Sequence, residues 1–286
     1  MTWCTLQEDI ELVQELLGID SRSLSAELGI SRMTFNRWGK NPNQASPAKL
    51  EAFYSYAFNR GLRLCEIHAQ LFLEESRARN LVPLFHGSKG GIDGPLSLSR
   101  SRTDNDFGKG LYCGESLEQA GSFIARFPHP ICYFVAFDEH ALRKAVFHVN
   151  TEWMLAIALF RGKLGDYSGH PALETLTEKV NEADYVVAPI ADNRMFDLID
   201  SFIEGEITDA QCEHSLSATS LGSQFVLRSN AALQNVVKLQ PHYVCSAEKS
   251  AYLEAQRERM RIGSDKVKAA KRAYRSEGRY IEELLS

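Results

Sequence analysis

The sequence has no run of about 18 apolar residues, the length that a membrane-spanning helix requires. Its first ten residues include Glu8 and Asp9 and lack a basic start followed by an apolar stretch, so we expect no secretory signal. The six cysteines are scattered without a Cys-x-x-Cys pair, which is typical of free thiols in a reducing compartment. These absences predict a cytoplasmic protein without membrane attachment, disulfide framework or metal site.

Two nucleotide-binding signatures are also missing. No strand leads into Gly-x-Gly-x-x-Gly, and there is no Walker loop, which excludes a Rossmann or P-loop domain. The 44% hydrophobic and 24% charged residues are typical of a globular protein and exclude disorder, collagen or coiled coil as an overall description. A chain of 286 residues has room for one large domain or two modest ones.

The net charge of −5 is distributed unevenly. Residues 1–80, 81–240 and 241–286 carry −1, −7 and +3. Because phosphate binding needs clustered Lys and Arg, the acidic centre argues against a large nucleic-acid footprint there. The basic tail is predicted to be helical, with breaks at Gly263 and Gly278. It either binds nucleic acid or a partner, or it packs against the preceding region through Tyr274, Tyr280, Ile281 and Leu284.

Residues 1–80 show helical periodicity throughout. The segment from Ser23 to Trp38 resembles the helix-turn-helix of phage-repressor-type proteins, with Ala26 letting the helices approach and Gly29 turning the corner. In that resemblance the apolar residues Ile30, Phe35 and Trp38 face the core. The side chains that would reach DNA are Arg32, Thr34, Asn36 and Arg37. Since this region has no net positive charge, a structural or partner-binding role stands as the alternative to DNA contact.

Residues 81–240 mix strand-like and helix-like patterns, which predicts an α+β domain. Strands are expected at residues 81–86, 131–137, 145–149, 185–188 and 224–227. Helices are expected at residues 116–126, 151–160, 195–203 and 209–218.

Three short motifs stand out in this region: Leu84–Lys89, a strand running into a glycine turn; Asp106–Tyr112, which contains two glycines; and Ser223–Leu227, the start of a strand. Taken singly, each has a plain structural interpretation, with His86 ending a strand, Tyr112 in the core and the glycines in turns.

Together and in this order they resemble the ADP-ribosyltransferases of the His-Tyr-Glu branch, which includes the poly(ADP-ribose) polymerases. The resemblance implies a split-sheet fold that binds NAD as substrate, with no metal. A similar bacterial group of uncharacterised transferase-like proteins also has the Ala191-Asp192-Asn193 and Gln224-Phe225-Val226 stretches. The NAD-binding residues implied are His86, Gly87, Ser88, Phe107, Gly108, Gly110, Tyr112, Phe123, Asp192 and Asn193, and the catalytic set is His86, Tyr112 and Gln224.

Gln224 departs from the family, which has a glutamate that bonds the nicotinamide ribose and stabilises its developing positive charge. Three outcomes are open: the enzyme is slow, a carboxylate such as Asp192 or Glu118 substitutes, or the site binds NAD without turnover. Four basic residues are candidates for binding the anionic diphosphate of NAD: Lys89, Arg100, Arg102 and Lys109.

The predicted organisation is a helix-turn-helix domain at 1–80, an ADP-ribosyltransferase-like domain at 81–240 and a helical tail at 241–286. The leading hypothesis is a bacterial mono-ADP-ribosyltransferase that modifies a protein or nucleic acid, as the toxin of a toxin–antitoxin or phage-defence pair. Two alternatives are a DNA-binding regulator that senses NAD or ADP-ribose with an inactive transferase site, and an NAD hydrolase.

Overall fold

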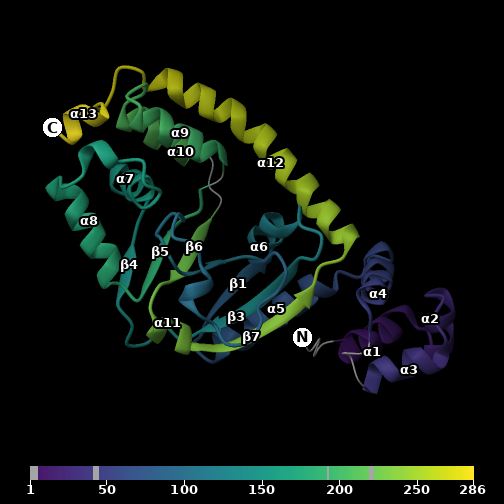
Figure 1. The fold of residues 1–286 in the computed structure, drawn as a ribbon. Helices are drawn as coiled ribbons and strands as arrows, with labels where there is room; N and C mark the ends of the chain where they lie inside the picture. The colour runs from purple at the N-terminus through teal and green to yellow at the C-terminus, as the bar shows by residue number, and fades with distance from the viewer. Residues whose placement is uncertain (1–5, 41–44, 192, 219–221) are drawn as a thin grey trace. The chain divides into compact units, whose positions relative to one another are not determined.

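The computed structural model describes residues 6–40, 45–191, 193–218 and 222–286 (Figure 1). Two compact units are each assembled from separate stretches of chain. The first unit comprises Met1–Pro95, Ser116–Asp138 and Val237–Ala255, and the second comprises Leu96–Glu115, Glu139–Val236 and Gln256–Ser286. Each unit therefore contains segments that are far apart in the sequence.

The first unit begins with five helices. They are α1 (Leu6–Leu17), α2 (Ser21–Glu27), α3 (Arg32–Lys40), α4 (Pro47–Asn59) and α5 (Leu64–Ala78). Local sequence sets their ends: the Asp20 carboxylate accepts a hydrogen bond from Ser23 N at 2.7 Å, and the Ser31 hydroxyl accepts one from Thr34 N at 3.2 Å. Gly29, with a φ of +64°, makes the predicted turn between α2 and α3.

An apolar core joins these helices, with Leu24, Phe35, Trp38 and Phe53 at its centre. Phe35 and Trp38 are buried as predicted, and Ile30 packs against them. The prediction for Ala26 is wrong, because that side chain is exposed. Its neighbour Ser25 is 3% exposed and is the small residue that faces the interior, one position earlier on the helix.

The remaining part of the first unit is a sheet with helices against it. Strands β1 (Val82–Ser88), β3 (Ile131–Phe137) and β7 (Val236–Tyr243) are ordered β1-β3-β7, and β1 pairs antiparallel with β3. Helices α5 and α6 (Leu117–Ile124) contact β1, and Phe72, Phe85, Ile124 and Phe134 pack between them.

The second unit contains four strands in the order β4-β5-β6-β2. They are β2 (Leu111–Gly114), β4 (Lys144–Val146), β5 (Tyr185–Pro189) and β6 (Ser223–Leu227). The β4–β5 pair is parallel, whereas β6 runs antiparallel to both β5 and β2. The strands are therefore mixed in direction.

Helices surround the core of this unit, in which Trp153, Met154, Phe202 and Val226 are buried. The longer helices are α7 (Thr151–Phe160), α8 (Pro171–Glu182), α9 (Asn193–Ile203) and α10 (Asp209–Ser217). The shorter elements are η2 (Leu98–Arg100), η3 (Gly165–Tyr167), α11 (Asn230–Gln234) and α13 (Ile281–Leu284). Helix α12 (Ser246–Ala273) contributes residues to both units.

The α+β class is confirmed, with N-terminal helices, and all five predicted strands are present. The sequence did not predict β2, β7, α8 and α11.

The break predicted at Gly263 is wrong, because α12 continues through it; Gly278, with a φ of +85°, does lie in the turn before α13. In the tail, Ile281 is buried and Tyr274 stacks on His214 with 3.5 Å between ring centroids, which agrees with the packing alternative for these residues. Tyr280 is exposed.

Within the ranges described, no helix combines the length and apolar character needed to cross a membrane.

Candidate active site

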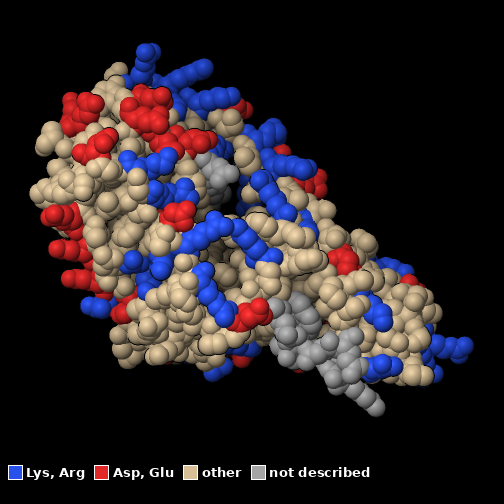
Figure 2. Space-filling model, viewed as in Figure 1, with Lys and Arg blue, Asp and Glu red and all other residues tan. Residues whose placement is uncertain are grey.

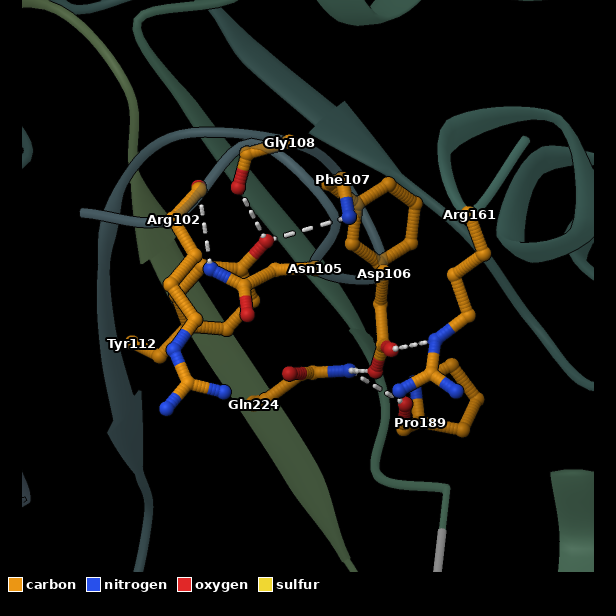
Figure 3. A network of polar contacts seen from close by, with 9 residues as sticks. All are labelled: Arg102, Asn105, Asp106, Phe107, Gly108, Tyr112, Arg161, Pro189 and Gln224. Atoms are coloured by element: carbon orange, nitrogen blue, oxygen red, sulfur yellow. Dashed lines mark hydrogen bonds and ion pairs between the residues drawn. The ribbon is translucent and has the colours of Figure 1, made fainter.

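The loop before β2 is closed by the hydroxyl of Tyr112 (Figure 3). Tyr112 Oη accepts a hydrogen bond from Phe107 N at 3.0 Å and donates one to Gly108 O at 2.8 Å. Gly108 has a φ of +71°, which favours glycine at this turn. Burial raises the pKa of the Tyr112 phenol, so the hydroxyl stays neutral and can both accept and donate. Tyr112 therefore holds the loop in shape.

Gly110 has a packing reason of its own. A Cβ at this position would lie 2.5 Å from Val226 Cγ1 and 3.0 Å from Leu227 O on β6. Any side chain would therefore force the loop away from the strand that carries Gln224. Gly110 N also donates to Ser101 Oγ at 3.0 Å, which ties the two ends of the loop together.

Gln224 is 7% exposed at the beginning of β6, between β2 and β5. Its amide nitrogen donates to Asp106 Oδ2 at 3.2 Å and to the carbonyl of Pro189 at 3.1 Å (Figure 3). The predicted motif residue Gln224 and the loop are thus connected through Asp106, the first residue of the Asp106–Tyr112 motif.

Asp106 is 9% exposed and forms an ion pair with Arg161, whose Nε lies 3.1 Å from Asp106 Oδ1. Burial raises the pKa of the Asp106 carboxyl, while the hydrogen bonds from Gln224 and Arg161 oppose that shift. The Arg161 guanidinium in turn lies over the Phe196 ring at 3.6 Å. Neither Asp106 nor Arg161 was predicted as a site residue. The sequence signal for Asp106 is its position at the start of the Asp106–Tyr112 motif.

The carboxylate in contact with Gln224 is that of Asp106. The carboxylates predicted as substitutes for the family's glutamate are those of Asp192 and Glu118. Asp192 lies outside the described residues. Glu118 is on α6, in the first unit. Asn193, the other predicted residue of this stretch, is the first residue of α9.

The first unit holds the remaining predicted NAD-binding residues, His86, Gly87, Ser88 and Phe123. His86 is half-buried near the end of β1, opposite Tyr133 on β3, with 6.2 Å between ring centroids. The Ser88 hydroxyl accepts a hydrogen bond from Gly91 N at 3.0 Å, which shapes the turn after the strand.

Gly87 and Phe123 are fixed by α6. A Cβ on Gly87 would lie 2.6 Å from Ile124 Cγ2 and 2.8 Å from the carbonyl oxygen of Ala120, so glycine is required by helix packing. Phe123 points outward from the same helix and is 64% exposed, unusual for so large an apolar ring. The convergence of these residues with Tyr112 and Gln224 on one NAD stays a prediction.

On α3, Arg32, Asn36 and Arg37 are exposed. Thr34 is half-buried and its hydroxyl lies 2.9 Å from Ser31 Oγ. Three of the four predicted DNA-contacting residues therefore lie on the surface of the helix. Figure 2 shows basic side chains distributed over much of the visible face of the molecule, interspersed with acidic ones.

Within the part of the chain that the structure describes, no three His, Cys, Asp or Glu side chains lie close enough together to hold a metal ion. The candidate site consists of hydrogen bonds around the Gln224 amide and the Tyr112 hydroxyl. Residues 82–238, more than half of the chain, match the model of a family described as a protein of unknown function (DUF3990), and the chain belongs to this family. Neither a curated protein nor a solved structure matches the chain.

Proposed function

We propose that the chain is an NAD-dependent ADP-ribosyltransferase that transfers a single ADP-ribose to a macromolecular acceptor, a protein or a nucleic acid. The proposal rests on the ordered set of His86, Tyr112 and Gln224 and on the resemblance that it carries. The observation that supports it most directly is the buried Gln224 amide, connected through Asp106 to the loop that Tyr112 closes.

In the proposed reaction, the bond between C1′ of the nicotinamide ribose and the ring nitrogen of nicotinamide breaks. Nicotinamide leaves with the electron pair, C1′ becomes positively charged, and a nucleophilic atom of the acceptor then attacks it. Groups that bind this charged ribose better than NAD itself accelerate the reaction. Gln224 contributes the dipole of a neutral amide, with the Asp106 carboxylate on the far side of its nitrogen. We therefore expect turnover slower than that of transferases of the His-Tyr-Glu branch, whose site is built around a negatively charged glutamate.

The test uses purified full-length chain and NAD labelled separately on nicotinamide and on adenine, with cell extract as the source of acceptor. A transferase releases labelled nicotinamide and leaves the adenine label on protein or nucleic acid. Release of both nicotinamide and free ADP-ribose in equal amounts identifies a hydrolase. Absence of nicotinamide release overturns the enzymatic proposal.

A second candidate is a DNA-binding regulator that senses NAD or ADP-ribose, and the exposed Arg32, Asn36 and Arg37 on α3 favour it. A gel shift on DNA upstream of the chain's own gene, with and without NAD, tests this candidate. NAD-dependent binding to DNA with NAD left intact supports the regulator; DNA binding that is absent at low salt excludes it.

A toxin of a toxin–antitoxin or phage-defence pair is the cellular role that we propose for the transferase. Induced expression is expected to arrest growth, and His86→Ala is expected to abolish the arrest. An antitoxin would be a protein that restores growth when it is expressed together with the chain. Growth arrest that persists in His86→Ala contradicts this role.

A further inference from the structure

Resting on the proposed function, we infer that Asp106 is a positioning residue: it orients the Gln224 amide so that its oxygen accepts a hydroxyl of the NAD nicotinamide ribose. The family resemblance assigned no role to Asp106. The inference comes from a chain of contacts in the second unit that runs from Phe196 through Arg161 and Asp106 to Gln224.

Two acceptors fix which end of the amide faces the protein. Asp106 Oδ2 and Pro189 O lie 3.2 and 3.1 Å from the same Gln224 atom. Only the NH2 group can satisfy both, because the amide oxygen would meet two further oxygens there. Arg161 occupies the other carboxylate oxygen of Asp106 at 3.1 Å, so the carboxylate cannot rotate without losing that bond. Asp106 and the Pro189 carbonyl therefore determine the orientation of the Gln224 amide.

The amide oxygen is left for a ligand. It points to the side of Gln224 opposite Asp106 (Figure 3), and no hydrogen-bond donor within the described ranges reaches it. An amide whose nitrogen is fully engaged offers an acceptor only, and its natural partner is a hydroxyl donor. A ribose hydroxyl has this chemistry.

The same contacts make a glutamine compatible with this position. A glutamate at 224 would place a second carboxylate about 3.2 Å from Asp106 Oδ2 and against the Pro189 carbonyl, and both contacts would be repulsive. Restoring the family's glutamate alone is therefore expected to disturb the site. Changing Asp106 to asparagine at the same time returns a donor to the pair, since its amide nitrogen can face the new carboxylate while its oxygen still accepts from Arg161.

The experiment measures kcat and KM for nicotinamide release by wild type, Asp106→Asn, Gln224→Glu and the double variant. We expect each single variant to lower kcat by ~10–100-fold with a smaller change in KM. The double variant is expected to recover at least ~10-fold over either single variant. Recovery of this kind follows from pairing between the two side chains, and loss of a merely structural residue would not produce it.

The matched control is Asp200→Asn, which removes the same charge from another ion pair of the second unit, with Lys163 at 3.2 Å, and is expected to keep wild-type kcat. The melting temperature of every variant is measured alongside. Wild-type kcat in Asp106→Asn, or losses that multiply in the double variant, overturn the inference while leaving the proposed function intact. A wild type that neither binds NAD in calorimetry nor releases nicotinamide overturns both.

Discussion

The two segments that carry the predicted site residues are held in different ways. In the second unit, the polar groups of Asp106, Tyr112 and Gln224 are bonded to one another or to nearby backbone. In the first unit, close packing of Gly87 on α6 fixes the end of β1, and Phe123 remains exposed. Polar contacts therefore pre-organise the second segment, whereas the first depends on close packing and leaves one aromatic ring exposed.

Burial disfavours the charged form of a titratable group, so it shifts the pKa of a buried base and of a buried acid in opposite directions, as one residue in each unit illustrates. In the first, His242 is 4% exposed and stacked on Phe134, and burial lowers the pKa of its imidazole to about 3. In the second, burial raises the pKa of Asp106. The histidine is neutral in the folded protein but gains a proton in the unfolded chain below pH 6.5. It therefore weakens folding as the pH falls from about 6.5 toward 3, whereas Asp106 weakens folding as the pH rises above 3.8.

The largest expected effect follows from that histidine. His242→Phe removes the proton uptake, so the free energy of unfolding should fall less between pH 7 and pH 4 than in wild type, by up to roughly 3 kcal/mol. The imidazole Nε2 of His242 has no hydrogen-bond partner among the described residues, so the phenylalanine variant loses no hydrogen bond at that atom. Urea denaturation at the two pH values measures the difference. An unchanged pH dependence contradicts the proposed burial effect.

The second prediction tests the shape dependence of the first segment. Gly87→Ala places a methyl group 2.8 Å from a backbone oxygen and should lower the free energy of unfolding by about 2 kcal/mol. Gly90→Ala is the matched control, since its Cβ would meet no atom within 4 Å. Thermal denaturation compares the two variants. Equal melting temperatures would show that packing on α6 does not demand glycine.

The third prediction tests the hydrogen bonds of the Tyr112 hydroxyl, which hold the loop before β2. Tyr112→Phe removes the acceptor of Phe107 N and the donor to Gly108 O, at an expected cost of about 1–2 kcal/mol. Tyr167→Phe serves as control, because its hydroxyl has no hydrogen-bond partner among the described residues. Urea denaturation measures both. A Tyr112 variant as stable as the control means that the hydroxyl is not what holds the loop.

The smallest effect on stability is expected at Phe123. Because the ring is 64% exposed, Phe123→Ala should change the free energy of unfolding by less than about 0.5 kcal/mol while reducing the melting-temperature shift that NAD produces. Leu16→Ala, at a side chain 51% exposed on α1, should leave that shift unchanged. A full shift in Phe123→Ala would remove the ring from the proposed site.

How far the sequence predicts this fold depends on how local the signal is. The strand at Ile131–Phe137 is apolar along its whole length, and its boundaries were predicted correctly. Strand β7 contains Lys238, Gln240 and Pro241 and is mostly half-buried, so its pattern gives little indication of a strand. Strand β2 is only four residues long and ends in a glycine, which is typical of a turn.

The candidate site divides in the same way. The motif around Gly108 and Gly110 could be identified from the sequence because it contains two glycines close together. The turn conformation requires the first, and packing on β6 requires the second. The contact between Asp106 and Gln224 joins residues 118 positions apart, one in the loop before β2 and the other in β6. No local pattern encodes such a distance. The resemblance implied NAD binding for Gly87, and the structure adds a packing requirement, because a Cβ there would meet α6.

The most direct test of the proposed function is calorimetric titration of the full chain with NAD. One NAD is expected to bind per chain, and His86→Ala and Gln224→Ala are each expected to weaken binding at least ~10-fold. Wild-type affinity in either variant would contradict the prediction that the substituted residue binds NAD, and a chain that binds no NAD would contradict the proposed function.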